Sequence, residues 1–292
     1  EIDAFVCNEP ESFRALNISS PSQRALNISL GCEEEERIFA GQVLLAAGTG
    51  GRELIVKELF SKWTVMEDDD KEKAGETKIN DTMKKQKENK RKWLIHLIDD
   101  SQVLIWASKG GHVGVVERIL EVVGINVNEA VIGCTPLHIA SCIGNVEIVK
   151  VLLGAKNINV NQADKDNGSA PLWIASQNGH TDVVALLLGT PGIQINQHNN
   201  EDATPLWIAS VQGHIGTVRL LLQQPDIDIH KGPGGRTAAD GATKRGHHEI
   251  VELLKDAGAT TNIQQLIIMG FNSVSATKAL ALHRNNVDHA CD

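Results

Sequence analysis

The sequence predicts an all-α protein in which stacked helix pairs form a solenoid, followed by a small bundle of three helices. Two observations predict the stack: an apolar box recurs at a nearly constant interval, and a glycine follows each box by four residues. A leucine-rich tail closes most copies. The boxes end in alanines that are 35, 34 and 33 residues apart, at Ala140, Ala175, Ala209 and Ala242. Such a period is the mark of a repeat architecture.

Each copy is expected to form two short helices. In the first complete copy, the predicted first helix spans Pro136 to Ile143, because proline suits the first turn of a helix. Gly144 should end it, since glycine adopts a positive φ at little cost. The second helix is predicted over Val146 to Leu153, where apolar residues recur with a helical period. One such pair cannot bury its apolar face, so at least three copies must stack.

Earlier parts of the chain contain two weaker copies. One places Ala107 at 33 residues before Ala140 and keeps the glycine and the apolar tail. A more divergent one begins near Ala47. The count is therefore six candidate copies, of which four are clear.

These residues resemble ankyrin repeats, clearly over residues 104–259 and loosely over 42–60. The resemblance implies helix pairs with short projecting β-hairpin fingers, and binding to protein partners without catalysis. Trp173 and Trp207 replace the usual histidine of the box, and the loop from Asp164 to Ser169 is one residue longer than usual. In the last copy Ala238 replaces the proline, as in a capping repeat.

The resemblance also suggests which residues contact a partner, because finger tips and the exposed ends of the first helices usually make contact in this family. On the fingers these are Lys165, Asp166, Ser169, Asn200, Glu201 and Ala203. On the helices they are Cys142, Ile143, Gln177, Asn178, Val211 and Gln212. The partner itself cannot be predicted, because one fold serves unrelated ligands.

Composition and motifs argue against several other functions. The net charge of −9 disfavours a general nucleic-acid surface. No apolar stretch is long enough to span a bilayer, and no phosphate-binding loop or nucleophile elbow occurs. Four histidines share one repeat position, too far apart to hold one metal ion, so we expect them to be structural: His112, His180, His214 and His247. No cofactor, metal or catalytic residue is predicted, and five cysteines without a CxxC pair favour an intracellular protein, cytoplasmic rather than nuclear.

Residues 1–40 have no functional interpretation. We expect a divergent repeat over 41–64, a charged and disordered insertion over 65–92, and repeats over 93–260. The insertion holds almost no apolar residues, so it cannot fold by burial.

The last segment, 261–292, resembles an incomplete UBA domain, the ubiquitin-associated fold. The resemblance is carried by Leu266, Met269, Gly270, Phe271, Ala276, Ala279, Leu280, Asn286, Val287 and Ala290. It implies three short helices and ubiquitin binding through Met269, Gly270 and Phe271. The alternative is that these side chains are the core of a small helical cap.

The sequence therefore favours an adaptor whose repeats bind a protein while the UBA-like segment binds ubiquitin. Two alternatives stay open. One is a plain ankyrin scaffold that does not bind ubiquitin. The other is a fragment of a larger ubiquitin-pathway enzyme.

Overall fold

The computed structural model describes residues 102–131, 133–268 and 277–278, together with residues 50, 56, 88, 92 and 98. The chain divides into two compact units, Glu1–Gln162 and Ala163–Asp292. Nearly all of the predicted segments 1–40, 41–64 and 65–92 lie outside the described residues, as do Met269, Gly270 and Phe271.

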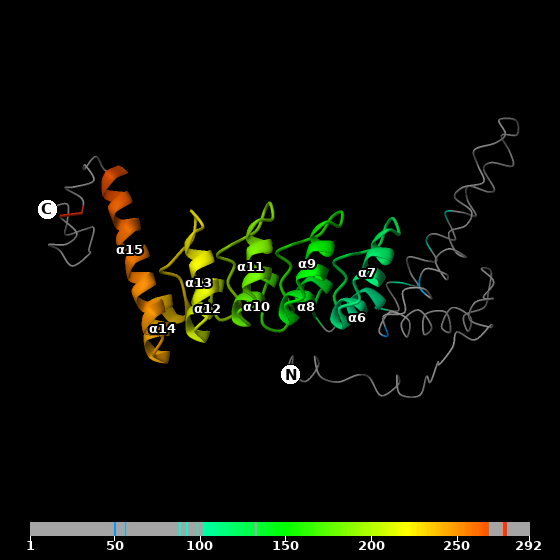
Figure 1. Ribbon diagram of the computed structural model, residues 1–292, viewed down its shortest axis with the longest axis horizontal. Helices are drawn as coiled ribbons and strands as arrows, with labels where there is room; N and C mark the ends of the chain where they lie inside the picture. Colours follow the sequence, from blue (N-terminus) through cyan, green and yellow to red (C-terminus); the bar gives the residue numbers. More distant parts are fainter. Residues whose placement is uncertain are drawn as a thin grey trace, which may run out of the picture. The chain divides into compact units, whose positions relative to one another are not determined.

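The described part of the first unit contains two helix pairs (Figure 1). The first pair is α6 (Val103–Gly110) and α7 (Val113–Leu120), and the second is α8 (Pro136–Ile143) and α9 (Val146–Leu153). Helix α6 packs against α8, and α7 packs against α9. First helices thus form one row and second helices another. The helices predicted over Pro136 to Ile143 and Val146 to Leu153 are confirmed.

The second unit continues the same plan with three further pairs in its described residues (Figure 1). The first helices are α10 (Pro171–Gln177), α12 (Pro205–Gln212) and α14 (Ala238–Arg245). The second helices are α11 (Thr181–Leu188), α13 (Ile215–Leu222) and α15 (His248–Ile268). A short 3-10 turn, η3 (Pro233–Gly235), precedes α14. Helix α12 packs between α10 and α14, and α13 packs between α11 and α15.

Threonine side chains start three of the first helices. Thr135 Oγ1 accepts the backbone N–H of His138 at 3.1 Å, and Thr204 Oγ1 accepts that of Trp207 at 3.2 Å. Thr237 and Asp240 form a reciprocal capping box at the start of α14. The backbone and side-chain hydrogen bonds that Thr237 donates to the Asp240 carboxylate lower the pKa of that carboxyl group.

Small side chains lie where the first helices pack against one another. Ala209 of α12 and Ala242 of α14 are completely buried, and both belong to one apolar cluster with Leu206. The remaining buried members are Val218, Leu221, Ala238, Ile250, Val251 and Leu254. Each helix pair alone would expose this apolar face, so burial between repeats is the main source of stability.

The predicted β-hairpin fingers stay a prediction. Over the described residues no strand is formed, and the sole pairing is an isolated antiparallel bridge between Val131 and Cys134. Two of the other described connections are turns in which the Asp164 and Asn199 side chains accept backbone N–H groups of Ser169 and Ala203.

Helix α15 is longer than the repeat requires. It comprises 21 residues and runs through Ile268, across the boundary predicted between residues 260 and 261. After Gly258 the helix contains neither proline nor glycine, so nothing in its sequence breaks it there.

Candidate protein-binding face

The first finger of the second unit is organised by one buried carboxylate. Asp164 accepts the backbone N–H groups of Asp166 at 2.9 Å, Asn167 at 2.7 Å and Ser169 at 2.8 Å. The Ser169 hydroxyl also donates to this carboxylate. A short acidic side chain that accepts from the residues after it forms a local turn, which explains how the longer loop keeps a defined shape.

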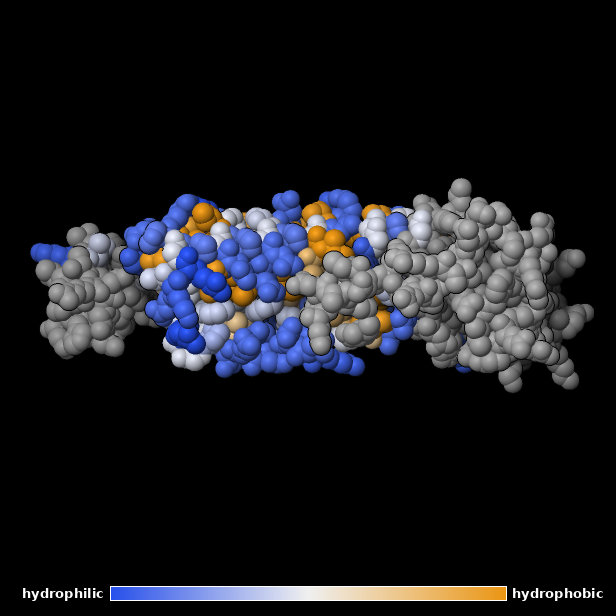
Figure 2. All heavy atoms as spheres, turned by 90° about the horizontal axis from the view of Figure 1, so that it is seen from below, coloured by the Kyte–Doolittle hydropathy of each residue, from blue (hydrophilic) through white to orange (hydrophobic). Residues whose placement is uncertain are grey.

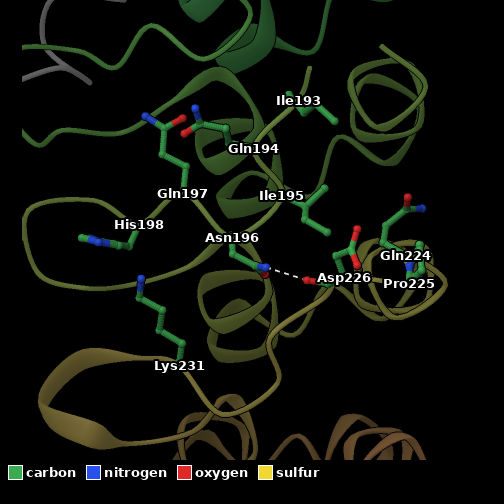
Figure 3. Close-up of a pocket in the computed structure, with 10 residues that line it drawn as sticks. All are labelled: Ile193, Gln194, Ile195, Asn196, Gln197, His198, Gln224, Pro225, Asp226 and Lys231. Carbon is green, nitrogen blue, oxygen red and sulfur yellow. Dashed lines mark hydrogen bonds between the residues drawn. The ribbon is translucent and has the colours of Figure 1, made fainter. Parts of the chain in front are cut away.

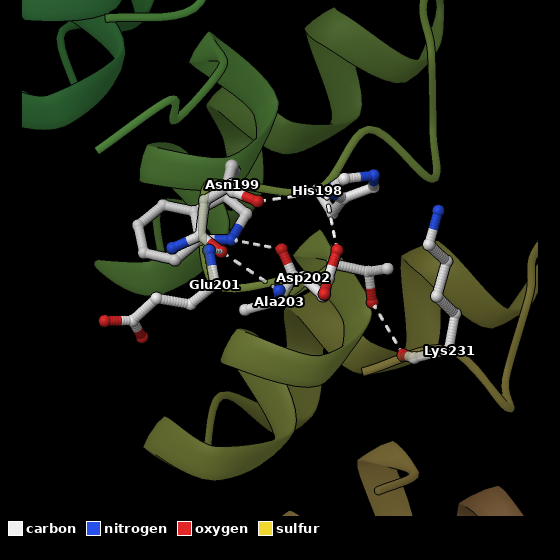
Figure 4. Close-up of polar contacts among 8 residues, drawn as sticks. His198, Asn199, Glu201, Asp202, Ala203 and Lys231 are labelled. Atoms are coloured by element: carbon white, nitrogen blue, oxygen red, sulfur yellow. Dashed lines mark hydrogen bonds and ion pairs between the residues drawn. The ribbon is translucent and has the colours of Figure 1, made fainter. Parts of the chain in front are cut away.

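The next finger uses an amide in the same place. Asn199 Oδ1 accepts the N–H groups of Glu201 at 3.1 Å and Ala203 at 2.9 Å (Figure 4). Asp202 has a φ of 62°, and its carboxylate lies 3.4 Å from His198 Nδ1. The indole N–H of Trp173 donates to the Ala203 carbonyl at 2.8 Å, so the first helix of one repeat supports the finger of the next.

The two fingers are joined by hydrogen bonds. The Asn200 backbone N–H donates to the Asn167 carbonyl at 2.8 Å, and Asn200 Nδ2 donates to the Asp166 carbonyl at 3.2 Å. Lys165, Asp166 and Glu201 are exposed beside these bonds. Their backbones are therefore held in one continuous surface while their charged ends face solvent.

Two histidines, one in each of two successive repeats, contact a backbone carbonyl at the end of the preceding repeat's first helix. His214 Nε2 lies 2.8 Å from the Gln177 carbonyl oxygen, and His247 Nε2 lies 3.1 Å from that of Val211. These carbonyl groups lie in the last turns of α10 and α12, where backbone carbonyls have no intrahelical hydrogen-bond donor. The structural role predicted for these two histidines is thus supported by their geometry. Within the described stretches, no three His, Cys, Asp or Glu side chains are arranged to hold a metal ion.

The predicted contact residues fall into exposed and buried groups. Three are buried, with exposed fractions of 1% for Ser169, 2% for Ala203 and 8% for Val211. Their neighbours at the surface are Lys165, Asp166, Asn200, Glu201, Asn178 and Gln212, with Gln177 half-buried. In the first unit, Cys142 is half-buried and Ile143 is 38% exposed at the end of α8. The buried residues hold the fingers and helices, and the exposed ones are available to a partner.

The residues predicted from the sequence to contact a partner did not include exposed residues of the last repeat at equivalent positions. Arg236, Lys244 and Arg245 are all exposed and occupy the register of the predicted residues in the preceding repeats. Among the described residues, neither Lys244 nor Arg245 forms an ion pair with a carboxylate, whereas Arg236 interacts electrostatically with the Asp240 carboxylate. Figure 2 is turned about the horizontal axis of Figure 1, so α14 keeps its place along that axis. Strongly hydrophilic residues, coloured dark blue, gather there. Alignment of the repeats on Gly213 and Gly246 could have found them, because Lys244 and Arg245 precede the glycine as Val211 and Gln212 do.

A groove of about 770 Å³ in the second unit is lined by residues 193–198 and 224–226 and by Lys231 (Figure 3). Its wall includes Asn196, whose Nδ2 donates to the Asp226 carbonyl at 2.7 Å and whose Oδ1 accepts the Asp228 N–H at 2.9 Å. In the first unit Asn128 makes the same two kinds of bond, to Asn157 and Asn159. This amide therefore serves repeat stacking, and we assign the groove no ligand.

The helix pairs, their spacing and the packing that recurs from pair to pair within each unit define a repeat protein. The family model for ankyrin repeats matches residues 43–164, 104–199, 156–232 and 172–265, which together span well over half of the chain. The chain belongs to the ankyrin-repeat family, and its repeats indicate a protein–protein interaction module. A search of curated proteins found none that matches the sequence.

Proteins of this family are typically non-enzymatic interaction scaffolds. Among the helices that the structure describes, none combines the length and the apolar character needed to cross a membrane.

Proposed function

We propose that the protein is a non-enzymatic adaptor whose ankyrin face binds a protein partner and whose C-terminal segment binds ubiquitin. One contrast supports the first half. Ala175, Ala209 and Ala242 share one register and are all completely buried. Three positions later, at the ends of the same helices, lie the exposed residues Asn178, Gln212 and Arg245. A constant buried framework with changing neighbours at the surface is what binding on a common scaffold requires.

Within the second unit, the proposed contact face consists of the exposed finger residues and the ends of the first helices. The fingers present two opposite charges, Lys165 and Glu201, on backbones linked through Asn200. Neither of these charges has a carboxylate or ammonium partner in the described structure. Charged groups without intramolecular partners can pair across an interface and set its specificity. Cys142 and Ile143 provide the equivalent helix-end positions in the first unit.

A charge swap tests this face without changing the net charge. We expect the double variant Lys165→Glu/Glu201→Lys to lose partners that the unchanged protein captures from cell extract, because each charge now repels its former counterpart. The melting temperature should stay the same, since both side chains are exposed and unpaired. Quantitative mass spectrometry of captured proteins measures the loss.

The matched control exchanges another exposed pair. Glu252 and Lys255 of α15 form an ion pair of 2.8 Å, and Glu252→Lys/Lys255→Glu reverses it with the net charge unchanged. This control should retain every partner. If both swaps behave like the unchanged protein, the contact face lies elsewhere on the repeats.

The ubiquitin half of the proposal rests on Met269, Gly270 and Phe271 in the UBA-like segment. An apolar patch of this size buries little area, so we expect weak binding, at the low end for protein interfaces. Titration of isotope-labelled ubiquitin with the full chain should shift a confined set of ubiquitin resonances. Phe271→Ala should remove those shifts, whereas Phe271→Leu, which keeps an apolar side chain, should retain weaker ones.

Circular dichroism provides the folding control for both substitutions. If the unchanged, folded chain shifts no ubiquitin resonance at the highest attainable concentration, the ubiquitin half is wrong. The ankyrin scaffold alone would then stand, because the charge-swap experiment does not depend on the C-terminal segment.

A further inference from the structure

The chain contains two Asn–Gly pairs, Asn167–Gly168 and Asn178–Gly179, and both lie in the second unit. An asparagine followed by glycine can lose its side-chain amide without an enzyme, because glycine lacks a Cβ that would hinder attack by its backbone nitrogen. Ring closure requires that this nitrogen be accessible and that the asparagine side chain be able to approach it. Neither Gly168 nor Gly179 donates its backbone N–H to a described acceptor, so the two pairs differ in what holds the asparagine.

At the first pair the reacting groups have no other partner. Asp164 accepts the N–H groups of residues 166, 167 and 169 but not that of Gly168. No described group accepts the Gly168 N–H, and none binds the Asn167 side-chain amide. Asn167 is exposed at the finger. Neither reacting group is therefore held by a hydrogen bond, although the Asn200 side chain packs against Gly168, where an added Cβ would meet its Oδ1.

The neighbouring finger also favours the reaction electronically. The Asn200 N–H donates to the Asn167 carbonyl oxygen at 2.8 Å. This hydrogen bond draws electron density from the peptide group that Asn167 shares with Gly168. It stabilises the deprotonated Gly168 nitrogen, which is the nucleophile.

The second pair is held by a helix end. Asn178 caps α10, and its N–H donates to the Ile174 carbonyl at 3.1 Å. The next bond, from His180 N–H to the Ala175 carbonyl at 3.0 Å, spans the Asn–Gly peptide. Both glycines have a close neighbour, because an added Cβ at Gly179 would lie 2.5 Å from Nδ1 of His214. The helix-end hydrogen bonds are therefore what distinguishes Asn178. Ring closure at Asn178 would require this cap to open first.

We propose that Asn167 is a site of spontaneous deamidation and that the helix end protects Asn178. The Gly168 nitrogen forms a bond to Asn167 Cγ, the Cγ–Nδ2 bond breaks, and ammonia leaves with the Gly168 amide proton. One water molecule then hydrolyses the five-membered imide. Opening at the side-chain carbonyl gives aspartate at position 167, and opening at the backbone carbonyl gives isoaspartate.

Both products change the face on which the proposed function rests. Each adds a negative charge beside Asp166, and isoaspartate also inserts a methylene group into the backbone. That insertion displaces the carbonyl that accepts the Asn200 N–H. Deamidation would therefore alter the coupling between the fingers, whether or not the proposed partner exists.

The test is a timed incubation of the full chain at physiological temperature and mildly alkaline pH. Chymotrypsin cleaves at Leu172 and Trp173, between the two pairs, so mass spectrometry can follow the amide-to-acid change at each asparagine separately. We expect Asn167 to react about tenfold faster than Asn178 in the folded protein, since opening the cap lowers the reactive population. In denaturant the two rates should become similar, because only the shared Asn–Gly sequence then matters.

The variant Asn167→Gln keeps a side-chain amide but would have to close a less favourable six-membered ring. It should remove the fast acidic product and leave the melting temperature unchanged, while Asn178→Gln should leave the fast product intact. An isoaspartyl methyltransferase should label the aged unchanged protein and not the aged Asn167→Gln variant. The proposal is overturned if Asn178 reacts as fast as Asn167 in the folded chain, or if folding slows Asn167 to the rate of Asn178.

Discussion

Leu206→Ala is expected to lower the free energy of unfolding by about 2–5 kcal/mol, the range for removing a large side chain from a rigid core. Leu206 is completely buried in the cluster that joins α12 to α13, α14 and α15. Its neighbours come from two repeats, so they cannot collapse into the space without shifting a helix pair. The substitution therefore removes apolar contact and leaves a cavity.

Urea unfolding followed by far-ultraviolet circular dichroism measures this loss. The control is Val123→Ala, because Val123 is an aliphatic residue that is 68% exposed. It should change the stability by less than about 0.5 kcal/mol. Should Leu206→Ala cost no more than this control, the apolar cluster would not be the main link between the last two repeats.

Gly213→Ala is expected to cost about 2–4 kcal/mol, from two separable causes. Gly213 ends α12 with a φ of 85°, a conformation that is strained for alanine. An added Cβ would also lie 2.6 Å from Cε1 of His247, whose Nε2 contacts the Val211 carbonyl. The ring would have to move, and the link between the last two repeats would weaken.

Gly192→Ala separates the two causes. Gly192 has a φ of 80°, and an added Cβ would meet nothing within 4 Å. This variant should therefore show only the backbone cost, about 1–2 kcal/mol. In a His247→Ala background the cost of Gly213→Ala should fall to the same value, as a double-mutant cycle would reveal. Equal losses for the two glycine variants in the unchanged background would mean that the His247 ring moves freely.

The repeat pattern predicted the local elements accurately because local rules govern them. Pro136 and Gly144 delimit α8, since proline fits a first helical turn and Gly144 adopts a φ of 82°. Ala175 and Ala209 are small because first helices touch there, and both are completely buried. These requirements recur in each copy and are therefore visible in the sequence.

The contact face was less predictable, because exposure depends on what packs over a residue. Ser169 follows Asp164 closely enough to donate its hydroxyl to that carboxylate, and so it is buried within the finger. Val211 occupies the same register as Gln177, yet the side chain approaches Gly241 of α14, where an added Cβ would lie 2.6 Å from Val211 Cγ2. Register alone cannot show these neighbours.

The sequence by itself determined the family, the helix pairs and the ends of helices such as α8 and α9, because each repeat carries the same local signals. Only the tertiary structure decided which contacts identical side chains make in different repeats. Trp173 and Trp207 each lie in a copy of the segment Pro-Leu-Trp-Ile-Ala-Ser, at residues 171–176 and 205–210. Trp173 is buried and donates to the Ala203 carbonyl, because the next finger presents that carbonyl to it.

Trp207 is followed instead by the glycine-rich turn at η3. Its ring is half-buried and packs beside Gly232 and Gly241, where an added Cβ would lie 2.5 Å from Trp207 Cδ1 and 3.4 Å from Nε1, respectively. Its indole N–H is buried and has no hydrogen-bond acceptor among the described residues. The local sequence places both tryptophans at the same point of a first helix, but the acceptor must come from the next repeat, and only the folded stack shows whether that repeat supplies one.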